Sequence, residues 1–422
     1  MTGVRVADTV ASALLARVPR DVAAGAWRRD ATTVVGVGLA ELIQADGPAA
    51  FTALDHLAPG TWVGWCAFEL GHAVEPVRAD GASLAPRCVP DIAFARFDAH
   101  AVITDDGQVT LDGDGVSRAL LDRALATIDD PPDPHHRDDD RDDDRDAAWR
   151  TSIDRPAYEA GVEAIVDLLL AGECYQVNLT RQLTRAGAVD PVDIYEQLTR
   201  AHDAPYTSML RVQLGEYGKV AVVSASPELF LAQRGRAVET RPIKGTAADP
   251  DTLRGSAKDH AENLMIVDLA RNDLGRVCEP GSIHVPELFA IEAHPGLHHM
   301  VSTVRGTLRT DVGPRALLAA TFPPASVTGA PKPRVLQAIE DLEPVRRGVY
   351  CGAFGWIDTS CDEATLAVAI RTFTLYPGRT ELGVGAGIVA DSSPEAEWHE
   401  TELKASRLLA VARGDALAGR IS

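Results

Sequence analysis

The sequence lacks several features that would assign it to a class of protein at once. No apolar run in its 422 residues approaches the roughly 18 residues that a membrane span needs. Residues 1–20 are interrupted by Asp8 and lack the basic start and clean apolar block of a secretory signal. These absences predict a protein that stays in the cytoplasm.

Cysteine is scarce, and its spacing excludes two kinds of site. The six cysteines contain no Cys-x-x-Cys pair, which argues against a zinc site and against a disulfide framework. We therefore expect reduced and mostly buried thiols. The glycines of residues 62–71 lie among tryptophans and do not form the G-x-G-x-x-G loop of nucleotide-binding folds. A buried strand and turn is the simpler interpretation.

Positive charge is also in deficit. The formal net charge is -20, so nucleic acids and anionic membrane surfaces, which need a basic footprint, are not expected partners. Residues 129–146 hold ten Asp and three Arg, and they contribute -7 of this charge. A calcium loop would need a glycine and a terminal glutamate that the run lacks. We expect a disordered, solvated linker at 129–150, between an N-terminal part, 1–128, and a larger part, 151–422.

What the sequence does contain is a regular succession of strand and helix signals. Before the linker, residues 32–37, 61–68 and 92–97 are typical of strands. After it we expect a helix from Asp154 to Gly172, a strand at 174–183, a helix at 191–201, strands at 206–212 and 220–225, and helices at 253–276, 332–342 and 395–404. The chain is therefore expected to mix helices with strands throughout.

The stretch 239–246, Glu-Thr-Arg-Pro-Ile-Lys-Gly-Thr, places one amine on an extended segment. Pro242 removes a backbone donor and disfavours helix, so we expect an edge strand or a strand end. Thr240, Pro242 and Lys244 would then share one face, and Gly245 would permit a close approach of the backbone to a ligand. Lys244 is either a surface lysine or a nucleophile, and these eight residues alone favour the surface lysine.

Carboxylates occur in two helical segments where they could converge. Asp259 and Glu262 lie three residues apart near the start of one helix, so they share a face. Glu397, Glu400 and Lys404 share a stripe of the C-terminal helix. Each group also has an ordinary interpretation as a solvated helix end. Together, the carboxylates would suit a hard cation such as magnesium.

Further polar and glycine positions lie at strand ends. Glu228 directly follows a predicted strand, where a carboxylate is either a turn residue or an acid that projects into a cleft. Gly385 and Gly387 would leave backbone N–H groups accessible to a close ligand. Arg371 ends an apolar run, and an arginine there commonly binds a carboxylate by two parallel hydrogen bonds.

These segments, taken in their order along the chain, resemble the motifs of the chorismate-utilising enzymes. The resemblance rests on Tyr175 to Thr180, Ser226-Pro-Glu228, Pro242 to Thr246, Glu262 to Arg276, Thr328-Gly-Ala-Pro-Lys332, Gly385-Ala-Gly387 and Glu397 to Lys404. It covers residues 158–409, and residues 60–71 resemble the N-terminal part of the family. It implies an α+β fold of two stacked antiparallel β-sheets, a β-sandwich, with helices on the outer faces.

The resemblance also implies roles for individual residues. Glu262 and Glu400 correspond to direct magnesium ligands, with Asp259 and Glu397 as outer carboxylates. Glu228 corresponds to the general acid that protonates the departing C4 hydroxyl of chorismate. The positions that correspond to the substrate pocket are Gln176, Thr246, His299, Thr328, Tyr350, Arg371, Gly385, Gly387 and Lys404.

Lys244 separates two branches of this family. Anthranilate synthases usually carry alanine at the position of Lys244, whereas component I of aminodeoxychorismate synthase typically has the lysine. In that branch the amine adds at ring C2 as the C4 hydroxyl leaves, and ammonia then adds at C4 and expels the lysine. Gln176 favours the same branch, because isochorismate and salicylate synthases, which activate water, carry a lysine there.

The resemblance therefore implies magnesium-dependent amination of chorismate to 4-amino-4-deoxychorismate, with ammonia supplied by a glutamine amidotransferase partner. Two other interpretations stay open. An anthranilate or 2-amino-2-deoxyisochorismate synthase would release a 2-substituted product, and a non-catalytic relative would bind chorismate without turnover. The sequence does not separate para-aminobenzoate and folate biosynthesis from a specialised aromatic-amine pathway, since both would use the same site.

Overall fold

The computed structural model describes residues 5–79, 81–130, 148–187, 189–202, 204–294 and 297–413. Every strand pairing among them is antiparallel. The strands are β1 (Ala24–Arg29), β2 (Thr32–Ala45), β3 (Thr61–Cys66), β4 (Ile92–Thr104), β5 (Val109–Gly113), β6 (Arg150–Thr151), β7 (Gln176–Ala186), β8 (Tyr206–Leu214), β9 (Gly218–Ser226), β10 (Leu229–Arg234), β11 (Ala237–Arg241), β12 (Ile243–Ala247), β13 (His284–His294), β14 (Leu297–Thr307), β15 (Gly329–Ala330), β16 (Ala353–Asp358), β17 (Glu363–Val368), β18 (Thr372–Tyr376) and β19 (Arg379–Ile388).

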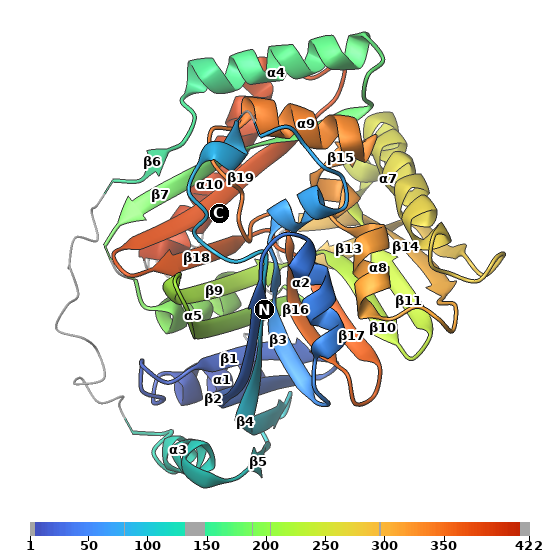
Figure 1. The fold of residues 1–422 in the computed structure, drawn as a ribbon. Coiled ribbons are helices and arrows are strands. Elements are labelled where there is room, and N and C mark those ends of the chain that lie inside the picture. Colours follow the sequence, from blue (N-terminus) through green and yellow to red (C-terminus); the bar gives the residue numbers. More distant parts are fainter. Residues whose placement is uncertain are drawn as a thin grey trace.

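Helices occur between the strands along the whole chain. They are α1 (Val6–Leu15), α2 (Pro48–Ala53), α3 (Gly115–Ala126), α4 (Arg155–Leu170), α5 (Pro191–Ala201), α6 (Pro250–Gly255), α7 (Ala257–Gly275), α8 (Pro314–Thr321), α9 (Lys332–Leu342) and α10 (Pro394–Arg413). Short 3-10 turns add η1 (Leu54–His56), η2 (Phe68–Ala73), η3 (Ala82–Leu84) and η5 (Ala325–Val327). Figure 1 shows α7 and α8 beside β13 and β14, and α4 at the opposite side from α3.

The strands form one hydrogen-bonded network that folds back on itself. From β14 it runs through β11, β10, β17, β16 and β3 to β4, and then through β2, β1, β8, β9, β18 and β19 to β7. The long strands β2 and β4 join these two halves, and their register shifts between Leu39 and Glu41. A shift of this kind bends a strand and increases its twist. The two layers of the sandwich are therefore hydrogen-bonded to each other through β2 and β4.

Three buried clusters show how the layers stack. One lies between the halves and contains Trp27 of β1, Trp65 of β3 and Trp356 of β16. A second lies against α1, α3, α5 and α10. A third lies against α2, α4, α7, α8 and α9. An apolar core between two antiparallel layers, with helices over the outer faces, confirms the predicted α+β sandwich.

Most predicted elements are present close to their predicted bounds. Helices α5 and α9 begin and end at the predicted residues, and Asp154 caps α4 by accepting a hydrogen bond from the amide of Ala157. The prediction of one helix over 253–276 is wrong. Ser256 interrupts it, because its hydroxyl caps α7 by accepting a hydrogen bond from the amide of Asp259 at 3.1 Å.

The stretch 239–246 is divided between two strands by Pro242. Strand β11 pairs on both sides, with β10 and β14. Strand β12, which carries Lys244, pairs with β14 alone among the described strands. The expectation of an edge strand is thus confirmed for the half of the stretch that carries the amine.

The predicted linker lies mainly in residues 131–147, outside the described residues. Beyond these, Arg150 already belongs to β6 and pairs with Thr184 of β7. The parts before and after the linker are not separate: β1 pairs with β8, and β3 pairs with β16. The described residues on both sides therefore share one network of strands.

The cysteines agree with the expectation of reduced and mostly buried thiols. All six cysteines are free, and four of them are buried. Within the described ranges, no helix has the length and apolar character that crossing a membrane requires.

Candidate active site

Lys244 projects from β12 and is partly buried. Its Nζ donates a hydrogen bond to the backbone carbonyl of Ser326 at 3.1 Å. Burial lowers the pKa of Lys244, and Lys404 acts in the same direction, whereas Glu262 and Glu228 oppose the shift. A lowered pKa increases the share of neutral amine, which is the nucleophilic form of a lysine.

Glu228 lies just past the end of β9, and its side chain is buried. Its Oε1 accepts a hydrogen bond from the amide of Ile243 at 3.3 Å, and Ser326 lines the same cavity as this carboxyl group. Burial raises the pKa of Glu228, while the Ser326 side chain, Lys244 and the Ile243 amide oppose the shift. A raised pKa keeps the carboxyl protonated to higher pH, as a proton donor requires.

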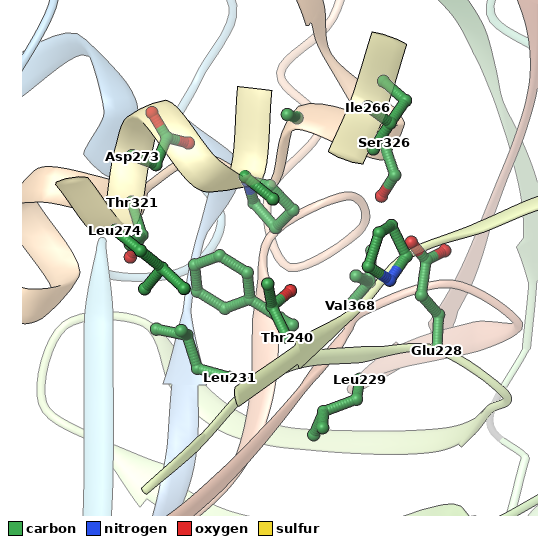
Figure 2. Close-up of a pocket in the computed structure, with 15 residues that line it drawn as sticks. Glu228, Leu229, Leu231, Thr240, Ile266, Asp273, Leu274, Thr321, Ser326 and Val368 are labelled. Carbon is green, nitrogen blue, oxygen red and sulfur yellow. The ribbon is translucent and has the colours of Figure 1, made fainter. Parts of the chain in front are cut away.

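A small cavity lies beside Glu228, between β10, β11 and α7. Figure 2 shows Glu228 and Ser326 together at one end of it, and Asp273 and Thr321 together at the other. Most of the wall between is apolar and is formed by Leu229, Phe230, Leu231, Pro242, Ile266, Ala270, Leu274, Pro324, Ala325 and Val368. Apolar surroundings of this kind disfavour a carboxylate, which accounts for the raised pKa of Glu228.

Gln176 of β7 and Gly387 of β19 meet next to Lys244. A Cβ atom added at Gly387 would lie 2.3 Å from Nε2 of Gln176 and 3.5 Å from Nζ of Lys244. The Gln176 side chain is buried, and neither its amide nitrogen nor its oxygen has a hydrogen-bond partner among the described residues. Burying an amide without partners costs free energy. The hydrogen-bonding capacity of both atoms is therefore unused among the described residues.

His299 of β14 lies opposite Thr246 of β12. The Oγ1 atom of Thr246 and Nδ1 of His299 are hydrogen bonded at 2.8 Å. Burial lowers the pKa of His299 to about 3, and the nearby Arg371 acts in the same direction. The imidazole is therefore neutral at physiological pH. Its buried Nε2 has no partner within the described part of the chain.

Arg371 connects β17 to β18 with a left-handed φ of 52°. This conformation is uncommon for a residue with a side chain and is often found at binding sites. Burial lowers the pKa of Arg371 to about 10, and Arg407 adds to the shift. No carboxylate of the described residues pairs with its guanidinium. Arg371 is thus a cation whose counterion would come from a ligand.

The acidic residues of α7 and α10 lie close enough to repel one another. Burial raises the pKa of Glu262, and Asp259 and Glu400 add to the shift. Burial also raises the pKa of Glu397, with Glu400 again adding to it. The hydroxyl of Ser392 opposes this second shift by donating to Glu397 at 2.6 Å. Carboxylates from two helices therefore face a common region.

These carboxylates do not form a preformed metal cage. No group of three or more His, Cys, Asp or Glu side chains in the described ranges is arranged to hold a metal ion. Magnesium usually keeps several waters and is bound by one or two carboxylates together with substrate oxygens. Glu262 and Glu400 match that requirement in the chemistry of their donor atoms.

Lys404 and Gly245 lie where the two acidic helices approach the strands. The Nζ atom of Lys404 donates to the carbonyl of Gly385 at 2.9 Å and lies 2.6 Å from Oε1 of Glu400. Gly245 has a φ of +88°, and a Cβ atom there would lie 3.0 Å from Cγ of Asp259. The sequence predicted a close approach of the backbone to a ligand at Gly245. In the structure the backbone at Gly245 closely approaches α7.

Two of the predicted pocket residues are engaged within the fold. Thr328 is fully buried, and its hydroxyl donates to the carbonyl of Pro324 at 2.7 Å. The ring of Tyr350 covers Gly383, where a Cβ atom would lie 2.1 Å from the ring. Alternate residues of a strand share a face, so Tyr350 lies along the same side of β19 as Gly385 and Gly387.

Sequence reasoning missed two features of this site. Ser326 contacts both Lys244 and Glu228. Lys332 and Asp273 form a buried ion pair at the other end of the cavity. These three residues have no distinctive periodicity. The only signal in the sequence that could have pointed to them is their position within or next to the family motifs.

The chain matches a known family over most of its length. The family described as chorismate binding enzyme matches residues 25–410. The chain is 44% identical over 273 residues to aminodeoxychorismate synthase component 1 of Klebsiella aerogenes, an alignment that covers 62% of this chain and 59% of that protein. It is 33% identical over 392 residues to an anthranilate synthase component 1 of Haloarcula marismortui, covering 85% of this chain and 77% of that protein.

Solved structures share the fold. The anthranilate synthase component I of Streptococcus pneumoniae superposes with a TM-score of 0.76 at 25% identity, covering 90% of this chain and 92% of that chain. The menaquinone-specific isochorismate synthase of Escherichia coli superposes with a TM-score of 0.72 at 17% identity, covering 95% and 91%.

Proposed function

This chain belongs to the chorismate-binding enzyme family, and we propose that it acts as component I of an aminodeoxychorismate synthase, which aminates chorismate at C4. The observation that carries the proposal is Lys244, a partly buried amine with a lowered pKa. It lies near the buried carboxyl of Glu228, whose pKa is raised by burial. A site that bound chorismate without a covalent step would not need a nucleophilic amine.

Lys244 supplies the electron pair of the first step. Its neutral Nζ forms a bond to ring C2, the two ring double bonds shift, and the bond between C4 and its hydroxyl oxygen breaks. Glu228 donates its proton to the departing oxygen, so water leaves and Glu228 becomes ionised. The ring is then held on Lys244 as a secondary ammonium.

Ammonia completes the second step. Its nitrogen forms a bond to C4, the double bonds shift back, and the bond between C2 and Nζ breaks with its electron pair. Lys244 leaves as a neutral amine, and the new C4 ammonium returns one proton to Glu228. The balance is chorismate plus ammonia giving 4-amino-4-deoxychorismate plus water.

Partnerless polar groups would bind and orient the substrate. Arg371 would form two parallel hydrogen bonds to a substrate carboxylate. The Nε2 atom of His299 and the amide of Gln176, which lack partners among the described residues, would be satisfied by the bound ring and its substituents. Such groups favour one orientation of a ligand because any other leaves them unpaired.

Glu262 and Glu400 would hold magnesium, with Asp259 and Glu397 as outer carboxylates. When bound, magnesium would neutralise the ring carboxylate of the substrate beside these acidic side chains. Burial and like charge both raise the pKa of Glu262, and a neighbouring cation would relieve that repulsion.

We propose a glutamine amidotransferase subunit as the source of ammonia. The support is the naming of relatives as component 1 of aminodeoxychorismate synthase, because a numbered component implies a second one. Free ammonium should replace that subunit in vitro, since the chemistry proposed for this chain needs only ammonia.

The proposal is tested by incubating the protein with chorismate, magnesium and ammonium and identifying the product by mass spectrometry and chromatography. A 4-amino product supports it. A 2-amino product would instead support an anthranilate or 2-amino-2-deoxyisochorismate synthase, the activity class suggested by the longer alignment to the Haloarcula marismortui protein. Chorismate that binds and stays unchanged would identify a non-catalytic relative.

A further inference from the structure

We propose that Ser326 is a positioning residue that holds the proton donor Glu228 and the nucleophile Lys244 in a fixed relation. The inference rests on the proposed function, because it assigns a role within that reaction. Ser326 and Glu228 line the same cavity, Figure 2 shows the two side chains pointing toward each other, and the Ser326 side chain acts to lower the pKa of Glu228. The carbonyl of the same residue accepts from Nζ of Lys244 at 3.1 Å.

The segment before Ser326 is fixed by side chains from the segment after it. The carbonyl of Thr321 accepts a hydrogen bond from Nζ of Lys332 at 2.8 Å. The carbonyl of Pro324 accepts from the hydroxyl of Thr328 at 2.7 Å. Lys332 and Thr328 are both buried, so these hydrogen bonds are shielded from competing water.

The backbone just after Ser326 is fixed as well. The carbonyl of Val327 accepts from Nη1 of Arg347 at 3.0 Å. The carbonyl of Thr328 accepts from the amide of Asn178 in β7 at 2.9 Å. Arg347 is buried and also donates to the carbonyl of Asn178 at 2.6 Å. Ser326 is therefore presented by a backbone that cannot shift without breaking buried hydrogen bonds, as a preorganised site requires.

The carbonyl and the hydroxyl of Ser326 act differently on the two groups. A carbonyl can only accept, so Lys244 must direct an N–H toward it and its lone pair elsewhere. A hydroxyl that donates to a carboxyl favours the ionised form, so Ser326 stabilises Glu228 after its proton has left. Among the described residues, the charged group that faces Glu228 is Lys244, and Asp273 lines the opposite end of the cavity.

The variant Ser326→Ala removes the hydroxyl and keeps the carbonyl. The matched control is Thr240→Val, which removes a hydroxyl from the wall of the same cavity. Both are titrated by carbon-13 NMR after labelling the glutamate side-chain carboxyls, with Glu228 assigned as the resonance missing from Glu228→Gln. We expect the Glu228 midpoint to rise by about one pH unit in Ser326→Ala and to stay in place in Thr240→Val. An unmoved midpoint in Ser326→Ala overturns the inference.

The kinetic readout uses the same variants. The rate of covalent attachment of chorismate to Lys244 should fall about tenfold to a hundredfold in Ser326→Ala, while KM for chorismate changes by less than about twofold. The limb of the pH–rate profile that reports the ionisation of Glu228 should move to higher pH. If Ser326→Ala does not fold, Ser326→Cys, whose thiol is a weaker donor, should show the same upward midpoint with a smaller change.

The two readouts separate this inference from the proposed function. A raised midpoint in a protein that does not aminate chorismate would support the hydrogen bond to Glu228 and refute the proposed function. A wild-type protein that aminates chorismate, with an unchanged midpoint and rate in Ser326→Ala, would refute the role of Ser326 alone.

Discussion

Lys332 and Asp273 form a buried ion pair, with 2.7 Å between Nζ and Oδ2, at the end of the cavity that lies opposite Glu228. The pair joins α9 to α7. Asp273→Asn would leave the Lys332 ammonium buried without its charge partner, so we expect the free energy of unfolding to fall by about 3 kcal/mol. Urea denaturation measures this loss.

The control for this prediction lies on the same helix. Asp268 and Arg271 form an exposed ion pair at 2.8 Å, and exposed pairs contribute little. Asp268→Asn should therefore change the free energy of unfolding by less than about 0.5 kcal/mol. Equal losses in the two variants would contradict the role given to the buried pair.

Lys244 should become neutral at a lower pH than an exposed lysine. Burial lowers its pKa, and an amine is neutral above its pKa, so its reactive fraction rises as the pH rises through that lowered value. The pH dependence of alkylation by acrylonitrile, followed by peptide mass spectrometry, measures both midpoints. Lys219, exposed on β9, is the reference. Equal alkylation midpoints for Lys244 and Lys219 would show that Lys244 is an ordinary lysine.

Gly387→Ala should impair amination without unfolding the protein. The added Cβ would lie 2.3 Å from Nε2 of Gln176, which is the end of a flexible side chain and can move. Displacing this amide beside Lys244 should lower kcat/KM by about tenfold to a hundredfold. At Gly313, by contrast, a Cβ meets no atom within 4 Å, so Gly313→Ala should retain full activity. If Gly387→Ala and Gly313→Ala had the same activity and the same melting temperature, this result would argue against the close contact between Gly387 and Gln176.

Magnesium should bind more weakly when either proposed ligand loses its charge. Glu262→Gln and Glu400→Gln each remove an anionic oxygen donor, so we expect the affinity for magnesium to fall about tenfold or more. Isothermal titration of the protein with magnesium chloride measures this apart from activity. The control is Glu395→Gln, an exposed residue of the first turn of α10. Unchanged binding in the first two variants would remove their assignment as ligands.

Local sequence signals predicted the elements well. Helices α5 and α9 occur at the predicted residues, because an N-terminal proline and an apolar stripe are local features. The break at Ser256 also has a local signal in the sequence. Ser256 and Asp259 have the three-residue spacing of a helix cap, and the hydroxyl of the serine accepts from the amide of Asp259.

The assembly of the site could be predicted only through the order of the motifs. Gly387 lies between Lys244 and Gln176, although β12 pairs with β14 and β19 pairs with β7, in each case between distant segments. Such pairings depend on tertiary packing, which periodicity does not encode. Ser326 is a small loop residue without a pattern, so its contacts with Glu228 and Lys244 became visible only in the structure.

The covalent role of Lys244 is tested most directly by intact-mass spectrometry of the protein mixed with chorismate and magnesium in the absence of ammonia. We expect a mass increase equal to chorismate minus one water, located on the peptide that contains Lys244, absent from Lys244→Ala and discharged by ammonium. The contrary result is a wild-type protein that aminates chorismate without forming this adduct, together with a Lys244→Ala variant that retains the activity.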